Sequence, residues 1–182
     1  MKGTIFVELI SMVEAAHGLD MVDAVIDKAG DALSTDGAYT AVGTYDHEEL
    51  LALVTALSEL APEQAPTLLD DFAVCLMGAF QRMHPEFFNA SGDLLDFLES
   101  VETHIHQEVL KLYPDSRTPA LNAQRLGEGA VRLSYRSHRP LAPFAVSLAR
   151  AGAGVFEQPV DIEIESQSDD GRAADFVVRV VA

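Results

Sequence analysis

Hydrophobic residues change their spacing once along this chain of 182 residues. Up to about residue 112 they recur every three or four positions, which is typical of amphipathic helices. Beyond Pro114 and Pro119 they alternate with polar residues in short runs, which is typical of half-buried strands. The pattern therefore predicts an α+β fold, in which an N-terminal helical part is followed by a C-terminal antiparallel sheet with one helix.

The spacing of hydrophobic residues in the N-terminal part predicts five helices. Gly18 and Gly30 stand where a residue in the left-handed conformation commonly ends a helix. Asp46 and Glu49 form an Asp-x-x-Glu capping box, and Ser91 is expected to cap the longest helix. The predicted helices cover residues 3–17, 20–29, 50–60, 67–83 and 92–112.

The pattern of hydrophobic residues in the C-terminal third predicts three strands and one helix. Its last two strands are expected to pair as a hairpin, because Asp169, Asp170 and Gly171 between them favour a turn. Neither a repeat nor a flexible linker interrupts the sequence, so we expect a single domain. The predicted strands cover residues 130–139, 160–166 and 175–181, and the helix covers residues 140–156.

The charge balance excludes several classes of partner. The 12 Lys and Arg residues are opposed by 29 Asp and Glu residues, and the formal charge of -17 argues against binding to nucleic acid or to an anionic membrane. The start of the chain does not resemble a signal peptide, and no apolar run is long enough to span a membrane. Cys75 is the only cysteine, which excludes an internal disulfide or a multi-cysteine metal site. We expect a cytoplasmic monomer that binds small molecules or proteins.

Three polar side chains share one face of the strand predicted at 130–139. Alternation places Tyr135, Ser137 and Arg139 on the same side as Val131 and Leu133. A phenol, a hydroxyl and a guanidinium in a row are hydrogen-bond donors suited to carboxylates at the rim of an apolar cavity. The alternative is a strand whose end emerges into solvent.

One histidine borders the apolar stripe of the helix predicted at 92–112. At the helical turn of about 100° per residue, His106 lies roughly 80° from Leu98, whereas His104 lies about 160° from His106. The two histidines therefore cannot share a metal ion. His106 is either a hydrogen-bonded core residue or the only protein ligand of an iron.

A single ligand explains both His106 and the row of donors. Haem is a flat apolar macrocycle that takes one axial ligand and carries two carboxylates. Its cavity needs apolar walls, and aliphatic and aromatic residues of the predicted helices are candidates, although each can equally be plain core. The candidates are Ile5, Leu9, Leu76, Met77, Phe80 and Phe144.

Together these residues resemble the H-NOX (haem nitric oxide/oxygen binding) family, which includes the haem domain of soluble guanylate cyclase. The resemblance rests on the start Met1–Ile5, the Gly-Thr-Tyr at 43–45, His106 seven residues before Tyr113-Pro114, and the Tyr-x-Ser-x-Arg row at 135–139. It covers essentially the whole chain. It implies the H-NOX fold enclosing haem b, with residues 1–65 as a distal helical part and 66–182 as the haem-bearing α+β part.

The resemblance also implies roles for single residues. His106 would be the proximal ligand of the iron, and the Tyr-x-Ser-x-Arg row would hold the propionates. Pro119 matches a proline that presses on the porphyrin, and Ile5 matches a residue that helps to distort it. The alternatives are a loop proline and a core isoleucine.

The distal side departs from the members that hold oxygen. Those members have a tyrosine nine residues after the first tyrosine of the row, and here this position is Phe144. Leu9 and Leu76 stand where such members can carry further polar or indole support. Loss of a hydrogen bond to a buried, partly charged acceptor such as bound oxygen costs roughly 1.5 to 3 kcal/mol of binding free energy, which lowers the oxygen affinity about ten- to a hundredfold. We therefore expect discrimination in favour of nitric oxide.

The resemblance implies a bacterial gas sensor and not an enzyme. Nitric oxide, and also carbon monoxide, would bind the iron, and nitric oxide would release His106 and free its helix. The signal would pass to a separate protein, such as a signalling histidine kinase or a cyclic-di-GMP enzyme. A passive carrier of haem or gas remains the alternative.

Overall fold

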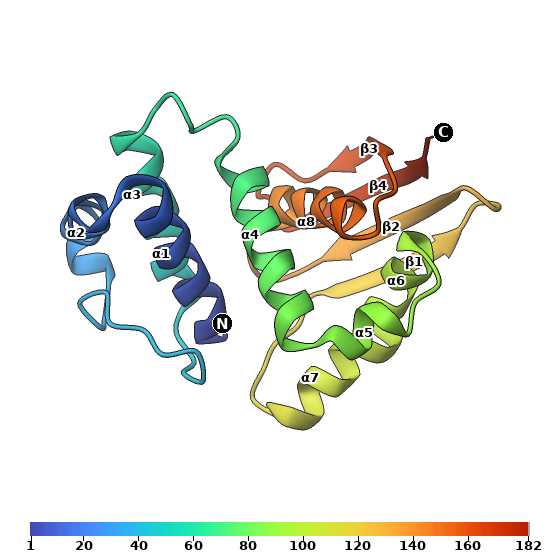
Figure 1. The fold of residues 1–182 in the computed structure, drawn as a ribbon, viewed down its shortest axis with the longest axis horizontal. Coiled ribbons are helices and arrows are strands. Elements are labelled where there is room, and N and C mark those ends of the chain that lie inside the picture. The colour runs from blue at the N-terminus through green and yellow to red at the C-terminus, as the bar shows by residue number, and fades with distance from the viewer. Residues whose placement is uncertain (182) are drawn as a thin grey trace. The chain divides into compact units, whose positions relative to one another are not determined.

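The computed structural model describes residues 1–181, which form two compact units divided between Leu76 and Met77. We call the part up to Leu76 unit 1 and the part from Met77 onward unit 2. The division falls within α4 (Leu68–Met83), so one helix contributes to both (Figure 1). Unit 1 is built on helices, whereas unit 2 combines helices with an antiparallel sheet, which confirms the predicted α+β class.

The helices of unit 1 pack around α2, which contacts both of its neighbours α1 and α3. Gly18 and Gly30 end the first two helices with φ of 83° and 49°, as predicted, because a residue with a side chain rarely adopts this conformation. The elements are α1 (Gly3–His17), α2 (Leu19–Ala29), a 3-10 turn (Gly30–Ala32) and α3 (His47–Leu60). The buried core includes Phe6, Leu9, Val13, Val22, Val25, Leu50, Leu53 and Leu57.

The capping box predicted before α3 is only half correct. Asp46 caps the helix, because its side chain accepts a hydrogen bond from the Glu48 amide at 3.1 Å. Glu49 does not return to the cap. Its buried carboxylate accepts hydrogen bonds from Ser34 Oγ at 2.7 Å and from the Tyr39 hydroxyl at 2.8 Å. Glu49 therefore ties the loop before α3 to the helix, and burial together with this bond raises the pKa of Tyr39.

The sheet of unit 2 is antiparallel with the strand order β1-β2-β4-β3. Alternate residues of β2 and β4 are fully buried on one face, as Leu133 opposite Phe176 shows. The other face carries ion pairs, such as Arg132 with Glu165 at 2.7 Å. The strands are β1 (Ala120–Arg125), β2 (Ala130–Arg136), β3 (Val160–Gln167) and β4 (Ala173–Val180).

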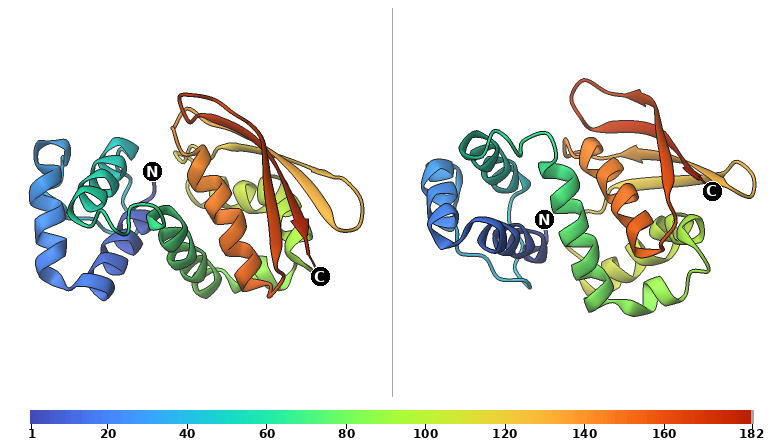
Figure 2. Two further views of the ribbon diagram at one scale, coloured as in Figure 1. Left: turned by 90° about the horizontal axis from the view of Figure 1, so that it is seen from above. Right: turned by 45° about the horizontal axis from the view of Figure 1, so that its top comes forward.

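The helices of unit 2 cover the buried face of this sheet. Figure 2 shows α8 lying along the sheet, where it contacts β2, β4 and β3, while α6 contacts β1 and β2. A π-helical segment, η2, joins α6 to α7 without a break in the chain direction. The elements are α5 (Pro85–Asn89), α6 (Leu94–Ser100), η2 (Val101–Ile105), α7 (His106–Leu112) and α8 (Ala142–Val155).

Several details of the predicted elements are wrong, and helix α5 was missed altogether. Strand β1 was missed, because none of its six residues is fully buried and the alternation is weak. Strand β2 ends at Arg136, three residues before the predicted end. The long helix begins at Leu94 with Asp93 as its cap, because Asp93 Oδ1 accepts a hydrogen bond from the Asp96 amide at 2.8 Å. Ser91 instead donates a hydrogen bond to the Phe87 carbonyl at 3.2 Å.

Within residues 1–181, every helix is too short or too polar to cross a lipid bilayer.

Candidate functional site

His106 stands at the junction between η2 and α7 and is the first residue of α7. Its side chain is 14% exposed, and its Nδ1 lies 2.9 Å from Glu102 Oε2. His104 is exposed, and its ring packs edge-on against Phe87 with ring centroids 5.7 Å apart. The two histidines therefore have different surroundings, as the helical spacing predicted.

The contact with Glu102 decides which nitrogen of His106 is available. A carboxylate oxygen accepts hydrogen bonds, so the neutral ring carries its proton on Nδ1. The lone pair then lies on Nε2. A half-buried neutral imidazole with Nδ1 held by a carboxylate is the usual state of a histidine that binds a metal through Nε2.

Glu102 also joins the histidine to the sheet. The same Oε2 atom accepts a hydrogen bond from the backbone amide of Leu121 in β1 at 3.1 Å. Leu121 lies directly opposite Tyr135 of β2 in the register of the sheet. The candidate ligand and the first residue of the donor row are thus connected through one carboxylate and one pair of strand residues.

The donor row is placed partly by a strand and partly by a turn. Tyr135 is buried in β2, and burial raises the pKa of its phenol, while a hydrogen bond with Ser137 and the charge of Arg139 partly offset this rise. Because β2 ends at Arg136, the alternation of a strand does not extend to Ser137 and Arg139. Instead the Arg139 amide donates to Ser137 Oγ at 3.1 Å, which keeps the three polar groups together.

Arg139 connects the row to the segment before β1. Its Nη1 donates a hydrogen bond to the carbonyl of Arg117 at 2.9 Å. Arg117 precedes Pro119, which stands immediately before the first residue of β1. Unit 2 therefore brings together the five polar or proline positions predicted from the sequence or its resemblance: Pro119, His106, Tyr135, Ser137 and Arg139.

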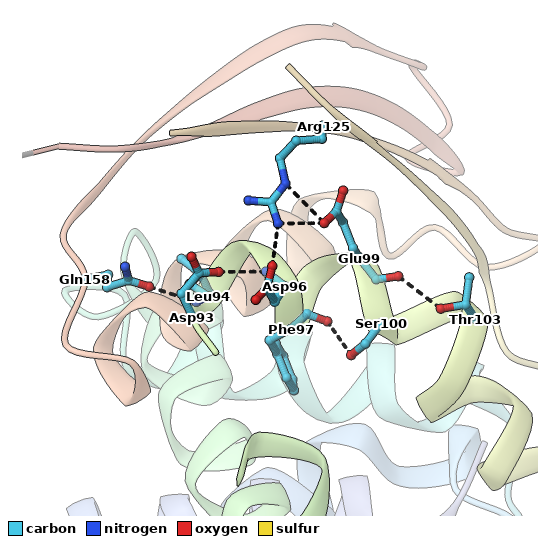
Figure 3. Close-up of polar contacts among 9 residues, drawn as sticks. All are labelled: Asp93, Leu94, Asp96, Phe97, Glu99, Ser100, Thr103, Arg125 and Gln158. Carbon is cyan, nitrogen blue, oxygen red and sulfur yellow. Dashed lines mark hydrogen bonds and ion pairs between the residues drawn. The ribbon is translucent and has the colours of Figure 1, made fainter. Parts of the chain in front are cut away.

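The helix α6, which precedes η2 and His106, is fastened to β1. Figure 3 shows Arg125 of β1 reaching two carboxylates of α6. Arg125 Nη2 donates to Asp96 Oδ1 and to Glu99 Oε2, each at 2.6 Å. The start of the helix is held as well, because Gln158 accepts a hydrogen bond from the Leu94 amide at 2.8 Å.

The predicted wall residues are divided between the units. Met77, Phe80 and Phe144 belong to unit 2, where Met77 and Phe144 are each 7% exposed. Gly152 of α8 admits close packing there, since an added Cβ would lie 3.2 Å from Leu94 and 3.9 Å from Met77. The remaining wall residues belong to unit 1, namely Ile5, Leu9 and Leu76.

Leu9 also lines a small apolar cavity inside unit 1. The cavity measures about 10 Å³ and lies among side chains of α1, α2 and α3, including Val13, Val25 and Leu53. Ile5 is half-buried on α1, whereas Leu9 and Leu76 are almost fully buried. Leu9 therefore takes part in the hydrophobic packing of unit 1.

The sequence analysis missed two contributors to this site. Glu102 could have been found, because it precedes His106 by one helical turn, the spacing at which side chains meet on a helix. Leu121 contributes only its backbone amide, which carries no sequence signal. Its role depends on the missed strand β1.

Comparison with known proteins decides the family. A family model described as Haem-NO-binding matches residues 2–164. The crystal structure of the Fe(II) unliganded H-NOX protein from K. algicida is 30% identical, with a TM-score of 0.91, covering 100% of this chain and 97% of that chain. The chain belongs to the H-NOX family. This confirms the resemblance and the predicted fold.

Two further H-NOX structures are similar over all or nearly all of their length. The solution structure of the IWP-051-bound H-NOX from Shewanella woodyi in the Fe(II)CO state is 34% identical, with a TM-score of 0.83, covering 100% of this chain and 95% of that chain. The S. oneidensis H-NOX in the Fe(II)NO state shares the fold at 24% identity, with a TM-score of 0.89 and complete coverage of both chains. No curated protein matches the sequence.

Membership of the family identifies the cofactor and the general role. H-NOX domains bind b-type haem and act as gas sensors, not as enzymes, and they bind gases such as nitric oxide and carbon monoxide. The donor set of unit 2 fits haem. His106 offers a single imidazole nitrogen to the iron. The phenol, hydroxyl and guanidinium of the donor row suit the two carboxylates of haem.

Proposed function

We propose that this H-NOX protein is a nitric oxide sensor that binds the gas at ferrous haem, discriminates against oxygen and signals to a separate protein. The observation that supports it most is the contact of His106 with Glu102. Its Nδ1 is held by Glu102, its Nε2 is left to bind a metal, and the donor row lies in the same unit. Bound ferrous haem b would supply the iron at which the gas binds.

Each polar residue of the site would hold one part of this cofactor. His106 would be the proximal ligand through Nε2. Tyr135, Ser137 and Arg139 would bind the two carboxylates, with Arg139 contributing charge-assisted bonds. Pro119 would contact the macrocycle and, with Ile5, would help to set its shape. Residues 1–65 would form the distal part and residues 66–182 the haem-bearing part.

Apolar residues would set the choice of gas. We propose that Leu9, Leu76, Met77, Phe80 and Phe144 line the cavity, with Leu9, Leu76 and Phe144 on the distal side. None of these three side chains can donate a hydrogen bond. Oxygen bound to ferrous iron carries partial negative charge and gains from a donor, whereas nitric oxide needs none. The pocket would therefore favour nitric oxide and also admit carbon monoxide.

Release of His106 would generate the signal. We propose that binding of nitric oxide would free His106 and that α7, which begins at His106, would then change position. The structure supports this choice of moving element, because α7 contains no buried residue and Leu112 at its end is 62% exposed. A helix with little buried surface moves at low cost.

The output would pass from a cytoplasmic, bacterial monomer to a second protein. We propose a signalling histidine kinase or a cyclic-di-GMP enzyme as that partner. A response of the partner to the gas separates a sensor from a passive carrier.

The absorption spectrum of the reduced protein tests the proposal. Purified protein is compared under argon, with nitric oxide, with carbon monoxide and in air. We expect a five-coordinate ferrous spectrum that changes with nitric oxide and carbon monoxide and stays unchanged on brief exposure to air. A stable spectral change in air would contradict the predicted choice of gas, and failure to take up haem would contradict the assigned site.

A further inference from the structure

We propose that Glu102 is a positioning residue, which sets the strength of the bond between His106 and the iron and couples His106 to strand β1. This inference rests on the proposed function, because it takes His106 as the iron ligand. It assigns a role to a side chain that neither the row of donors nor the apolar walls include.

The geometry makes Glu102 a junction between two elements. One oxygen atom, Oε2, accepts from His106 Nδ1 at 2.9 Å and from the Leu121 amide at 3.1 Å. Both side chains are partly shielded from water, with Glu102 34% and His106 14% exposed. A charge-assisted hydrogen bond in such surroundings is stronger than a neutral one on the surface.

The position of Glu102 along the helix gives this junction its importance. Upstream, Arg125 holds Asp96 and Glu99 of α6 to β1 (Figure 3). Downstream, α7 has no buried residue. Glu102 lies between the two, in the π-helical segment η2, a conformation that occurs frequently at functional sites. Glu102 therefore lies between α6, which ion pairs hold to β1, and α7, which has no buried residue.

An anionic acceptor on Nδ1 changes what Nε2 does. The carboxylate withdraws the Nδ1 proton slightly, and the ring becomes a stronger electron donor at Nε2. A stronger donor binds iron more tightly and favours the ferric over the ferrous state. Glu102 thus opposes the release of His106, so a signal requires a gas that weakens the iron bond strongly enough.

The junction also defines how a displaced His106 reaches the sheet. When the ring moves away from the iron, the shared oxygen must either follow the ring or keep the Leu121 amide. Leu121 is the residue opposite Tyr135. A displacement of Leu121 therefore also displaces Tyr135, the first residue of the donor row. The release of His106 is coupled in this way to β1 as well as to α7.

Two substitutions with a matched control test the electronic role. Glu102→Gln keeps the size of the side chain and removes its charge, and Glu102→Ala removes the acceptor. Glu108→Gln is the control, because it makes the same charge change on α7, where Glu108 pairs with Lys111 at 2.7 Å and not with His106. Thermal unfolding monitored by circular dichroism checks that all three variants fold.

The iron–histidine stretching band of the reduced protein and the reduction potential are the first readouts. Both Glu102 variants should lower the stretching frequency and raise the potential, and haem should dissociate roughly tenfold faster. Glu108→Gln should leave all three values at the wild-type level. Wild-type values in both folded Glu102 variants would overturn the inference. A wild-type protein without an iron–histidine band would instead overturn the assignment of His106.

A haem-free measurement separates the two failures further. Nitrogen-15 NMR of the apoprotein reports which ring nitrogen of His106 carries the proton, and hydrogen exchange reports the protection of the Leu121 amide. We expect the Nδ1–H form in the wild type, loss of this preference in Glu102→Ala, and exchange at Leu121 about ten- to a hundredfold faster. An unchanged tautomer and unchanged exchange would show that Glu102 holds neither group.

Discussion

The two units of this H-NOX protein differ in how they hold the residues proposed for the site. Unit 1 contains Ile5, Leu9 and Leu76, which are apolar, and Leu9 and Leu76 are almost fully buried. Unit 2 contributes polar groups that hydrogen bonds hold in place, such as His106 with Glu102 and Arg139 with Ser137. Packing tolerates exchange among apolar side chains of similar volume, whereas a hydrogen bond requires particular atoms.

This difference indicates a division of tasks. Capture of the cofactor requires donors and a ligand at fixed positions, and unit 2 contains the residues proposed for both tasks. In the proposed function, the choice of gas depends on the lack of a hydrogen-bond donor among apolar residues, two of which are leucines of unit 1. Unit 1 has Lys2 and Lys28 as its only basic residues among the 12 of the chain, so its charge also differs from that of unit 2.

The largest effect is expected from removal of the ligand in unit 2. His106→Gly deletes the only side chain proposed to bind the iron, so haem should be lost during purification unless free imidazole is added. With imidazole the protein should keep its haem and give the partner output of the gas-bound state, because the bond to α7 is absent. Absorption spectra with and without imidazole measure the first effect.

A variant of a neighbouring histidine provides the control for this experiment. His104→Gly removes an exposed imidazole from η2 and should retain haem without imidazole. Equal haem content of His106→Gly and wild type would exclude His106 as the ligand. Partner output at the unliganded level would show that release of His106 is not the switch.

A new donor among the apolar residues should give the next largest effect. Phe144→Tyr adds a hydroxyl to a buried side chain of α8. If this group reaches the bound gas, oxygen affinity should rise about ten- to a hundredfold, while nitric oxide affinity changes little. Difference spectra in air and under argon measure this gain.

Phe87→Tyr is the matched control, since it adds the same hydroxyl to the ring that contacts His84 and His104. This control should bind oxygen no better than the wild type. If Phe144→Tyr behaves like its control, the distal pocket obtains its selectivity from some other feature, and the division of tasks between packing and hydrogen bonds fails.

The sequence singled out the polar residues more readily than the contacts that support them. His106, Tyr135, Ser137 and Arg139 were singled out by residue type and spacing, because donors and ligands are chemically distinctive, and their roles were taken from the resemblance to the H-NOX family. Glu102 was missed because a glutamate on a helix usually faces water. Its meaning appears only when Leu121 is seen on the neighbouring strand.

Local irregularities explain the errors in the predicted elements. The sequence analysis treated the helix at 92–112 as uniform, and at regular helical spacing Leu112 lies on the same face as Leu98 and Ile105. Leu112 is 62% exposed, since the π-helical segment Val101–Ile105 changes the rotation per residue and carries the stripe away from the core. Strand β2 stops at Arg136, yet Ser137 and Arg139 still join Tyr135, because turn hydrogen bonds replace strand alternation.

A smaller effect is expected from a substitution of Glu49, a buried polar residue of unit 1, and it tests whether the two units differ as described. Glu49→Gln removes the charge from the acceptor shared by Ser34 and Tyr39, and it should destabilise the protein by about 1 to 3 kcal/mol. Haem spectra and the iron–histidine band should not change, because unit 2 holds the proposed ligand. Urea unfolding measures the stability, with the exposed Glu48→Gln as the control. An altered iron–histidine band would show that the polar network of unit 1 also specifies the site.

The smallest effect is expected on the ion-paired face of the sheet. Hydrogen bonds from Arg136 lower the pKa of Asp175 to about 2. Because this folded-state pKa lies below the ordinary value of 3.8, the pair stabilises the protein above pH 4, and the stabilisation is lost as the pH falls from about 4 to 2. Asp175→Asn should therefore cost about 1 kcal/mol at pH 6 and progressively less at lower pH. Urea unfolding at pH 6 and pH 3 measures this loss, and Asp169→Asn in the nearby turn controls for the change of charge. If Arg136 contributes nothing, the difference in unfolding free energy between wild type and Asp175→Asn should be the same at pH 6 and at pH 3. In that case hydrogen bonds would hold the proposed site of unit 2 but would not stabilise its sheet.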